Sequence, residues 1–237
     1  MKAIILAAGR GSRMKSLTSD KPKCLVELKG LPLLEMQLAA FRDSGVDDIA
    51  IVTGYKRKML EPYGLQEFHN SNWATTQMVS SLLCASEWLD SDDCIVSYSD
   101  IFFDASVVNL LTSSDALISV TYDLNWFNLW KKRFGDPLLD AETFKIDSEN
   151  NLKEIGMQPK DISSIQGQYM GLLKFRPEGW KNFSTVFSCL EDEAQRKIHM
   201  TGMLQKIIES KDIKIKAIGY DGIWGEVDSE SDLYVYN

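Results

Sequence analysis

The sequence has little of what secreted or membrane-spanning chains need. Its four cysteines form no C-x-x-C pair and have no nearby histidine, which is the pattern of reduced thiols in a cytoplasmic protein. No apolar run approaches the roughly 18–20 residues that a membrane-spanning helix requires. The apolar stretch at the N-terminus is short and is followed by arginines, which indicates a first strand rather than a signal peptide. We therefore expect a cytoplasmic protein with no membrane insertion.

Excess positive charge is also missing. The chain carries 26 basic and 34 acidic side chains, and its net charge of −8 argues against a nucleic-acid-binding surface. Its two histidines, His69 and His199, are isolated, so neither is assigned a catalytic role, and no zinc site or Ser-His-Asp triad is indicated. With 44% hydrophobic and 25% charged residues over 237 positions, the composition is that of a globular protein with a substantial core.

Strands and helices alternate in the first half of the chain. Short apolar or β-branched runs predict strands at residues 2–6, 48–53, 94–99 and 117–122. Between them, apolar residues at helical spacing predict helices over residues 32–45 and 78–89. This alternation is typical of a parallel sheet with right-handed crossovers, in which ligands bind at the carboxyl ends of the strands. The expected fold class is α/β, a Rossmann-like, mostly parallel mixed sheet flanked by helices.

The alternation weakens after about residue 122. A polar, aromatic-rich stretch covers residues 125–140, and residues 143–155 predict a hairpin that turns at Asn150-Asn151. The remaining predicted elements are a strand at 168–175, helices at 180–190 and 200–208, and a late strand at 213–218. No internal repeat, low-complexity tract or linker interrupts them, so we expect a single domain over residues 1–237.

The strongest functional signal is the segment Leu6-Ala7-Ala8-Gly9-Arg10-Gly11-Ser12-Arg13-Met14, with Pro22-Lys23 downstream. Two glycines after a buried strand let the backbone approach a ligand closely and turn N–H groups toward an anion. Positive charge gathers here too, because residues 1–25 carry six basic side chains and one acidic one, against 20 and 33 in the rest. These features predict an anion site, although a glycine turn with solvated arginines would give the same pattern.

Two common phosphate loops do not fit this segment. Met14 stands where the dinucleotide fingerprint has its third glycine, and the second strand ends in Val52-Thr53-Gly54-Tyr55 without the acid that would hold a ribose. The spacing is not that of a Walker loop either. An NAD-dependent oxidoreductase is therefore a distant alternative.

The same residues carry a resemblance to a known family. The segment from Leu6 to Met14 with Pro22-Lys23 resembles the signature loop of the nucleotidyltransferases that make sugar nucleotides and CDP-activated small molecules. The resemblance covers nearly the whole chain, at residues 49–55, 97–102, 168–175 and 224–233, the last with the pattern W-x-E-V-D-x-x-x-D-L. Within the family, the chain is most similar to the small phosphocholine cytidylyltransferase-like enzymes, whose members act on phosphocholine, aminoethylphosphonate or phosphorylated glutamine. The resemblance implies a nucleotide-binding half at about 1–122 and an acceptor-binding half at about 123–237.

The resemblance also implies a nucleotide site. Arg13 and Lys23 would be catalytic, because they would neutralise the pyrophosphate as it leaves. The nucleotide contacts would come from Leu6, Ala7, Ala8, Gly9, Gly11, Ser12, Gly54, Tyr55, Gln77 and Ser81. Gln77 stands where relatives more commonly have Asn, and helix capping is the alternative role for it. The preference for cytosine is taken from the subfamily and not from any one residue.

Three carboxylates would hold the family's divalent ion, usually Mg²⁺. The resemblance points to Asp100 and Asp228, with Glu226 as a further ligand, and Mg²⁺ prefers such hard oxygen donors. Asp100 and Asp228 lie 128 positions apart, so the sequence alone does not show that they meet. The alternatives are a turn acid at Asp100 and an N-cap of the last helix at Asp228.

The acceptor pocket would lie in the second half of the chain. The expected contacts are Trp130, Gln168, Tyr169, Gly171 and Trp224. The aromatic residues of segment 126–130 would box an ammonium group, and the basic trio Lys131-Lys132-Arg133 would meet a phosphate. The alternative for this segment is a lid or interface helix with solvated lysines.

The expected function is that of a Mg²⁺-dependent cytidylyltransferase. It would join CTP to a small phosphorylated or phosphonate acceptor, giving a CDP- or CMP-linked product and pyrophosphate, without a covalent intermediate. One alternative is a sugar-1-phosphate nucleotidyltransferase using UTP or dTTP. Another is a non-catalytic nucleotide-sensing domain, although the presence of both Asp100 and Asp228 counts against it. The resemblance further implies a role in cell-surface polysaccharide biosynthesis, and the sequence does not indicate an oligomer.

Overall fold

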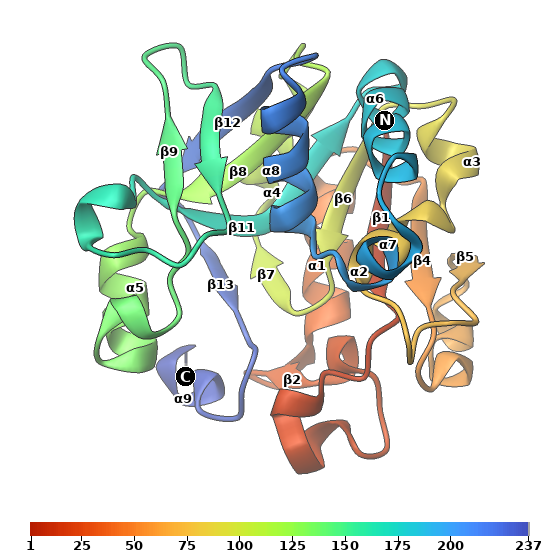
Figure 1. Ribbon diagram of the computed structural model, residues 1–237. Coiled ribbons are helices and arrows are strands. Elements are labelled where there is room, and N and C mark those ends of the chain that lie inside the picture. Colours follow the sequence, from red (N-terminus) through yellow and green to blue (C-terminus); the bar gives the residue numbers. More distant parts are fainter. Residues whose placement is uncertain (237) are drawn as a thin grey trace.

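A seven-stranded sheet forms the centre of the computed structural model, which describes residues 1–236 (Figure 1). In spatial order its strands are β12 (Ile215–Tyr220), β8 (Ile118–Asp123), β11 (Gln168–Phe175), β6 (Cys94–Tyr98), β1 (Lys2–Ala7), β4 (Ile49–Thr53) and β5 (Gln66–His69). Only β11 runs antiparallel to its neighbours, β6 and β8, whereas the other pairings are parallel. The prediction of a mostly parallel mixed sheet is confirmed.

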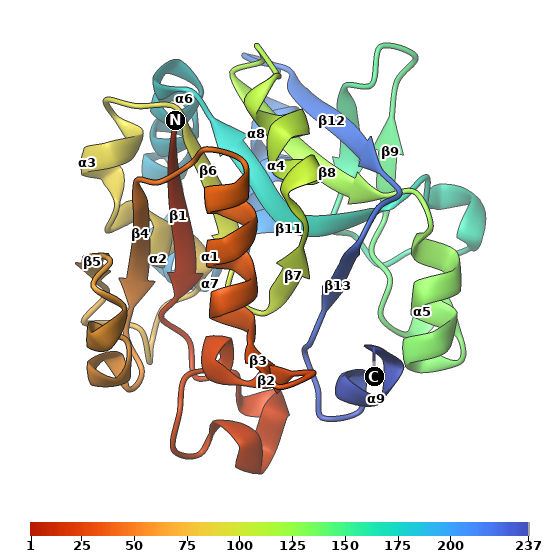
Figure 2. The same ribbon diagram turned by 180° about the vertical axis from the view of Figure 1, so that it is seen from behind.

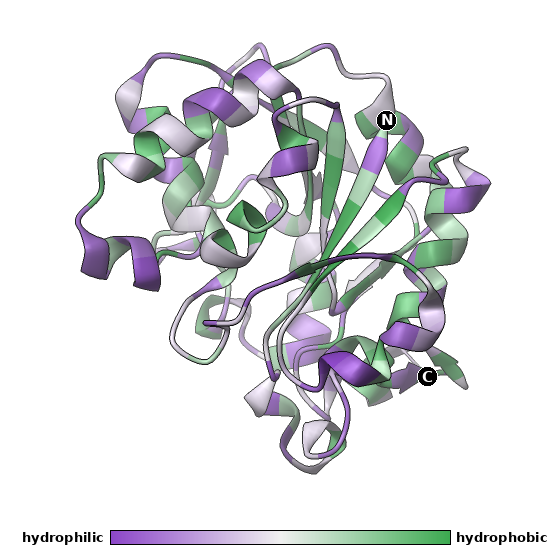
Figure 3. Cartoon of the chain, turned by 90° about the vertical axis from the view of Figure 1, so that its right-hand side faces the viewer, coloured by the Kyte–Doolittle hydropathy of each residue, from purple (hydrophilic) through white to green (hydrophobic). Residues whose placement is uncertain are grey.

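Helices cover both faces of this sheet (Figures 1 and 2). One face packs against α2 (Met78–Leu83), α3 (Ser86–Leu89), α6 (Pro177–Ser188) and α8 (Met200–Ser210), and the other against α1 (Leu33–Asp43), α4 (Ala105–Thr112) and α5 (Trp126–Phe134). Side chains of β1 alternate between these two cores, because successive residues of a strand point to opposite faces. In Figure 3 the central strands are mainly green, and the purple residues lie mostly on outer loops and helix surfaces.

Smaller elements gather around the sheet. Two-stranded ribbons pair β2 (Glu27–Leu28) with β3 (Leu31–Pro32), β7 (Ile101–Phe103) with β13 (Trp224–Glu226), and β9 (Phe144–Ile146) with β10 (Leu152–Ile155). Short helices α7 (Asp192–Lys197) and α9 (Asp232–Tyr236) complete the second half, and 3₁₀ turns follow the first strand at Ser12–Thr18 and Lys23–Leu25. Figures 1 and 2 place these turns and α9 at the same edge, below the carboxyl end of β1.

The predicted helices and strands are present with bounds shifted by up to about three residues, whereas β5 and α4 were not predicted. The helix predicted over residues 78–89 is broken after Leu83, where the Ser86 hydroxyl donates to the Leu83 carbonyl at 2.7 Å and α3 begins. Both segments keep their apolar side chains on the same core, which is why the helical spacing continues across the break. The late strand begins at Ile215 rather than at residue 213. Within residues 1–236, no helix is both long and apolar enough to span a membrane.

Candidate active site

The loop after β1 is shaped by glycines and by its neighbours. Gly11 has a φ of +68°, and a Cβ there would stand 2.8 Å from the side chain of Lys23. A Cβ on Gly54 would stand 2.6 Å from both the Ala8 carbonyl oxygen and the side chain of Trp73. Only glycine fits at either position without moving the loop.

Tyr55 supports the loop from behind. Its N–H donates to the Ala8 carbonyl at 2.9 Å, and its hydroxyl donates to the Ser19 carbonyl at 2.7 Å. Gly54 and Tyr55 do not line the cavity in front of the loop. Gly54 and Tyr55 therefore hold the loop in position and do not themselves face the space expected for the nucleotide.

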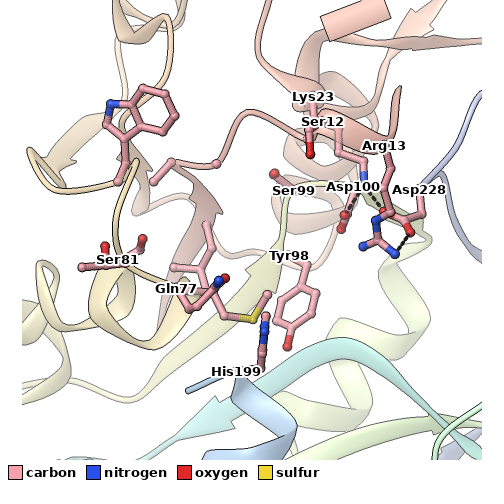
Figure 4. A pocket seen from close by; sticks show the side chains of 17 residues that line it. Ser12, Arg13, Lys23, Gln77, Ser81, Tyr98, Ser99, Asp100, His199 and Asp228 are labelled. Carbon is pink, nitrogen blue, oxygen red and sulfur yellow. Dashed lines mark hydrogen bonds and ion pairs between the residues drawn. The ribbon is translucent and has the colours of Figure 1, made fainter. Parts of the chain in front are cut away.

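A cavity of about 320 Å³ opens in front of this loop (Figure 4). Most of the predicted nucleotide contacts line it, namely Leu6, Ala8, Gly9, Gly11, Ser12, Gln77 and Ser81, together with Arg13 and Lys23. Ala7 does not line it, because its side chain packs in the core on the opposite face of the sheet. Gln77 makes no side-chain capping bond at the start of α2, so its amide is available to the cavity. We refer to this space as the nucleotide cavity.

Two basic side chains meet the acids of the site at the end of this cavity. Lys23 Nζ lies 2.6 Å from Asp100 Oδ2 and 2.6 Å from Asp228 Oδ1, and Arg13 forms an ion pair with Asp228. Burial lowers the pKa of Lys23, but its two carboxylate partners outweigh burial and the net pKa is raised. Lys23 is therefore a fixed positive charge. Figure 4 shows this group at one side of the cavity and Gln77 and Ser81 at the other.

The pairing of β7 with β13 brings the distant carboxylates together. Glu226 pairs with Ile101, and the Val227 N–H donates to the Asp100 carbonyl at 2.8 Å. As a result, oxygens of Asp100, Glu226 and Asp228 all lie within 4.8 Å of one another. Burial raises the pKa of Glu226, against the opposing effect of the Arg133 charge.

The donor set fits a hard divalent cation. It consists of carboxylate oxygens, and Asp100 Oδ1 is buried with no hydrogen-bond partner among residues 1–236. A buried carboxylate oxygen without a partner is costly unless a ligand satisfies it. These three side chains are the ones that the family resemblance implies as Mg²⁺ ligands, and Lys23 Nζ lies between Asp100 and Asp228.

A second cavity of about 290 Å³ adjoins the first, and we refer to it as the acceptor cavity. Among the predicted acceptor contacts, Gln168, Tyr169, Gly171 and Trp224 line it. Arg13, Met78, Tyr98, His199 and Asp228 line both cavities. The carboxylate cluster therefore lies where the two cavities join, which is where a reaction between their contents would occur.

Trp130 differs from the predicted arrangement. It is buried in the core under α5 and lines neither cavity. Its ring stacks on Trp224, with centroids 6.2 Å apart and an interplanar angle of 10°. Trp126 is also buried, so segment 126–130 does not form the expected aromatic box. Trp126 and Trp130 form the apolar side of α5 and pack against the core. Trp130 contacts the acceptor cavity only indirectly, through its stacking on Trp224, which lines that cavity.

The basic trio of α5 also divides. Lys131 and Lys132 are exposed to solvent, whereas only 1% of the Arg133 side chain is exposed. Arg133 pairs with Glu226 and Asp232 instead of facing the acceptor cavity. Helical spacing explains this difference, because three successive residues of a helix point in different directions. Arg133 lies on the side of α5 that faces the protein, whereas Lys131 and Lys132 face solvent.

Several cavity residues had no signal in the sequence. Tyr98, Asp140, Glu142 and Thr201 line the acceptor cavity, as does His199, which was assigned no role. Gln168 holds the segment of Glu142 in place, since its Oε1 accepts from the Glu142 N–H at 3.0 Å and its Nε2 donates to the Glu142 carbonyl at 2.6 Å. Burial raises the pKa of the Glu142 carboxyl. Isolated acids in a loop carry no pattern, so their convergence appears only in the fold.

This architecture is shared with a solved structure. The inositol-1-phosphate CTP transferase from T. maritima superposes with a TM-score of 0.76, over 99% of this chain and 93% of that chain, at 21% sequence identity. At this identity the likeness shows the fold alone, and the fold is that of the nucleotidyltransferases.

Sequence comparison then identifies the family. The model of the MobA-like NTP transferase domain matches residues 3–142, and the chain belongs to this family. It is 34% identical to CTP:phosphoglutamine cytidylyltransferase of Campylobacter jejuni over 99% of this chain and 98% of the relative. It is also 34% identical to choline-phosphate cytidylyltransferase of Streptococcus pneumoniae over 71% of this chain and 77% of that relative. The family resemblance read from the sequence is confirmed, and the protein is a nucleotidyltransferase.

Proposed function

We propose that this protein is a Mg²⁺-dependent cytidylyltransferase that joins CTP to a small phosphorylated or phosphonate acceptor bearing an amine. The observation that carries this proposal is the meeting of the glycine loop, two basic side chains and three carboxylates where two cavities join. The use of CTP is supported by the two relatives named above, both of which are cytidylyltransferases.

The residues of the nucleotide cavity fit an in-line transfer. The backbone after β1 would cradle the triphosphate, and the α-phosphorus would lie near the junction with the acceptor cavity. A phosphate or phosphonate oxygen of the acceptor attacks that phosphorus, the bond to the bridging oxygen breaks, and pyrophosphate leaves with the electron pair. No protein nucleophile is needed, because alignment and charge stabilisation lower the barrier.

Lys23 and Arg13 would act on the leaving group. Both are cations at the wall of the nucleotide cavity, and both are now held by Asp228. A divalent cation held by Asp100, Glu226 and Asp228 would neutralise charge on the phosphate oxygens. If the cation engaged these carboxylates, Arg13 and Lys23 would be available to contact the pyrophosphate.

The acceptor cavity favours a positively charged substrate. Its lining includes the acids Asp140, Glu142, Glu226 and Asp228, against the basic residues Arg13 and His199. Tyr98, Tyr169 and Trp224 add aromatic rings to the wall. Carboxylates and aromatic faces together recognise an ammonium group, while Arg13 at the junction suits a phosphate. Phosphocholine, phosphorylated glutamine and aminoethylphosphonate all combine a positively charged nitrogen group with such an acidic group.

Pyrophosphate release across a grid of substrates tests this proposal. The nucleotides are CTP, UTP, dTTP, ATP and GTP with Mg²⁺, and the acceptors are phosphocholine, aminoethylphosphonate, phosphorylated glutamine and glucose-1-phosphate. We expect turnover with CTP and one amine-bearing acceptor, abolished by EDTA. Turnover with UTP or dTTP and the sugar phosphate would instead identify a sugar-nucleotide enzyme. Tight nucleotide binding with no pyrophosphate release from any pair would favour the sensing domain.

A further inference from the structure

Arg133, at the end of α5, is fixed on every side. Its Nη1 donates to Glu226 Oε2 at 2.9 Å, while its Nε and Nη2 donate to the two carboxylate oxygens of Asp232 at 2.8 and 3.3 Å. The rings of Trp130 and Phe134 lie 5.2 and 4.8 Å from its guanidinium carbon. A planar guanidinium suits two carboxylates at once, whereas a lysine ammonium would reach them only as a point charge.

Asp232 connects Arg133 to the backbone of Asp228. Its Oδ2 accepts the backbone N–H groups of Asp228 at 2.9 Å and of Ser229 at 2.8 Å, and the residue is 2% exposed. These bonds fix the backbone from which the Asp228 side chain departs. Arg133 therefore contacts one member of the carboxylate cluster directly and braces a second through Asp232.

The charge of Arg133 also differs in kind from the other positive charges at the site. Carboxylates within 4.8 Å of one another repel when all are ionised. Lys23 and Arg13 offset this repulsion at Asp228, but both line the nucleotide cavity, where phosphate oxygens compete for them. Arg133 lines neither cavity, so its charge stays beside Glu226 whether or not a nucleotide is bound.

We infer that Arg133 is a positioning residue that sets the affinity of the carboxylate cluster for a divalent cation. It holds Glu226 directly, and Asp228 through Asp232, in place for the cation, and it lines neither the nucleotide nor the acceptor cavity itself. This inference rests on the proposed function, because it takes the cluster as the cation site. Outer-shell partners of metal ligands typically contribute about 10–100-fold to metal affinity, and we expect a loss in that range on changing Arg133.

Two variants and a matched control test the inference. Arg133→Lys keeps the positive charge but removes the planar guanidinium that bonds Glu226 and Asp232 at once. Asp232→Asn keeps the shape of the side chain and removes its negative charge. Lys132→Met removes a positive charge from the neighbouring exposed position of the same helix. Mn²⁺ binding to the CTP-loaded protein without acceptor is followed by electron paramagnetic resonance, with Mn²⁺ and CTP alone as the blank. The Mg²⁺ dependence of pyrophosphate release and the thermal midpoint are measured on the same preparations.

In both variants we expect Mn²⁺ affinity to fall by about 10-fold or more, and turnover to recover at high Mg²⁺ with the KM for CTP within about twofold of wild type. The control should match wild type in every measurement. Unchanged Mn²⁺ affinity in both folded variants would overturn the inference, as would lost turnover that high Mg²⁺ does not restore. Such results would leave the proposed function standing if wild type binds Mn²⁺ and needs Mg²⁺, whereas a wild-type protein that binds no Mn²⁺ with CTP would overturn both.

Discussion

Replacing Lys23 with methionine tests the charge stabilisation at the centre of the proposed chemistry. The substitution keeps most of the aliphatic stem that packs beside Gly11 and removes the charge between Asp100 and Asp228. One unit charge about 4 Å from charge developing on a phosphate oxygen contributes roughly 4 kcal/mol at an effective dielectric constant of about 20. That corresponds to about 10³-fold in rate, and losing one preorganised donor typically costs about 10²–10³-fold. We therefore expect kcat to fall by about 10²–10³-fold.

The assay is steady-state pyrophosphate release at saturating CTP, acceptor and Mg²⁺. Loss of Lys23 leaves Asp100 without its ion-pair partner and Asp228 with Arg13 alone, which destabilises the protein, so circular dichroism must show that the variant is folded. Lys21→Met, two positions away, is the control for removing one positive charge from the same segment. If folded Lys23→Met turned over within about threefold of wild type, the role assigned to Lys23 would be refuted.

Three further predictions follow from other contacts. Glu142→Gln should raise the KM for an amine-bearing acceptor by about tenfold, equivalent to about 1.4 kcal/mol, and equal KM values in variant and wild type would contradict the acidic recognition site. Gly54→Ala places a Cβ 2.6 Å from the Ala8 carbonyl oxygen, so CTP should bind at least about tenfold more weakly by calorimetry; wild-type affinity would show that the loop tolerates the shift. Burial raises the pKa of Asp123 from 3.8 to about 6, so the folded state binds this proton more tightly and loses stability as pH rises through that interval. Asp123→Asn should therefore stabilise the protein at pH 7.5 by about 1–2 kcal/mol after solvent screening, with no gain near pH 4, and melts showing the same difference at both pH values would refute this.

The main strands of the first half of the chain could be predicted from the sequence, because the patterns that specify them are local. A buried strand followed by two glycines, and apolar residues at helical spacing, depend on near neighbours in the chain. The positions of β1, β4, β6 and β8 follow from such patterns. The break between α2 and α3 does not, because the two segments keep one apolar face across it.

The candidate site was predictable only in part, for a related reason. Asp100 and Asp228 were chosen by resemblance, and the physical cause of their meeting is the pairing of β7 with β13, which no local pattern specifies. Trp130 illustrates the opposite error, since an aromatic side chain near a proposed pocket is as well suited to the core beneath it. Arg133 and Glu142 take their roles from partners far away in the chain.

The antiparallel strand of the seven-stranded sheet, β11, has a consequence for how this enzyme can be divided. β11 comes from the second half of the chain, yet it lies between β6 and β8, which come from the first half. A cut near residue 122 would leave β8 without either neighbour in the sheet, because β12 on its other side is also a late strand. The two halves are interleaved rather than joined end to end. Exchanging acceptor halves between relatives would therefore pack the β11 and β12 of one protein against the β6 and β8 of the other in one sheet, and altered acceptor choice is better sought by substituting side chains of the acceptor cavity.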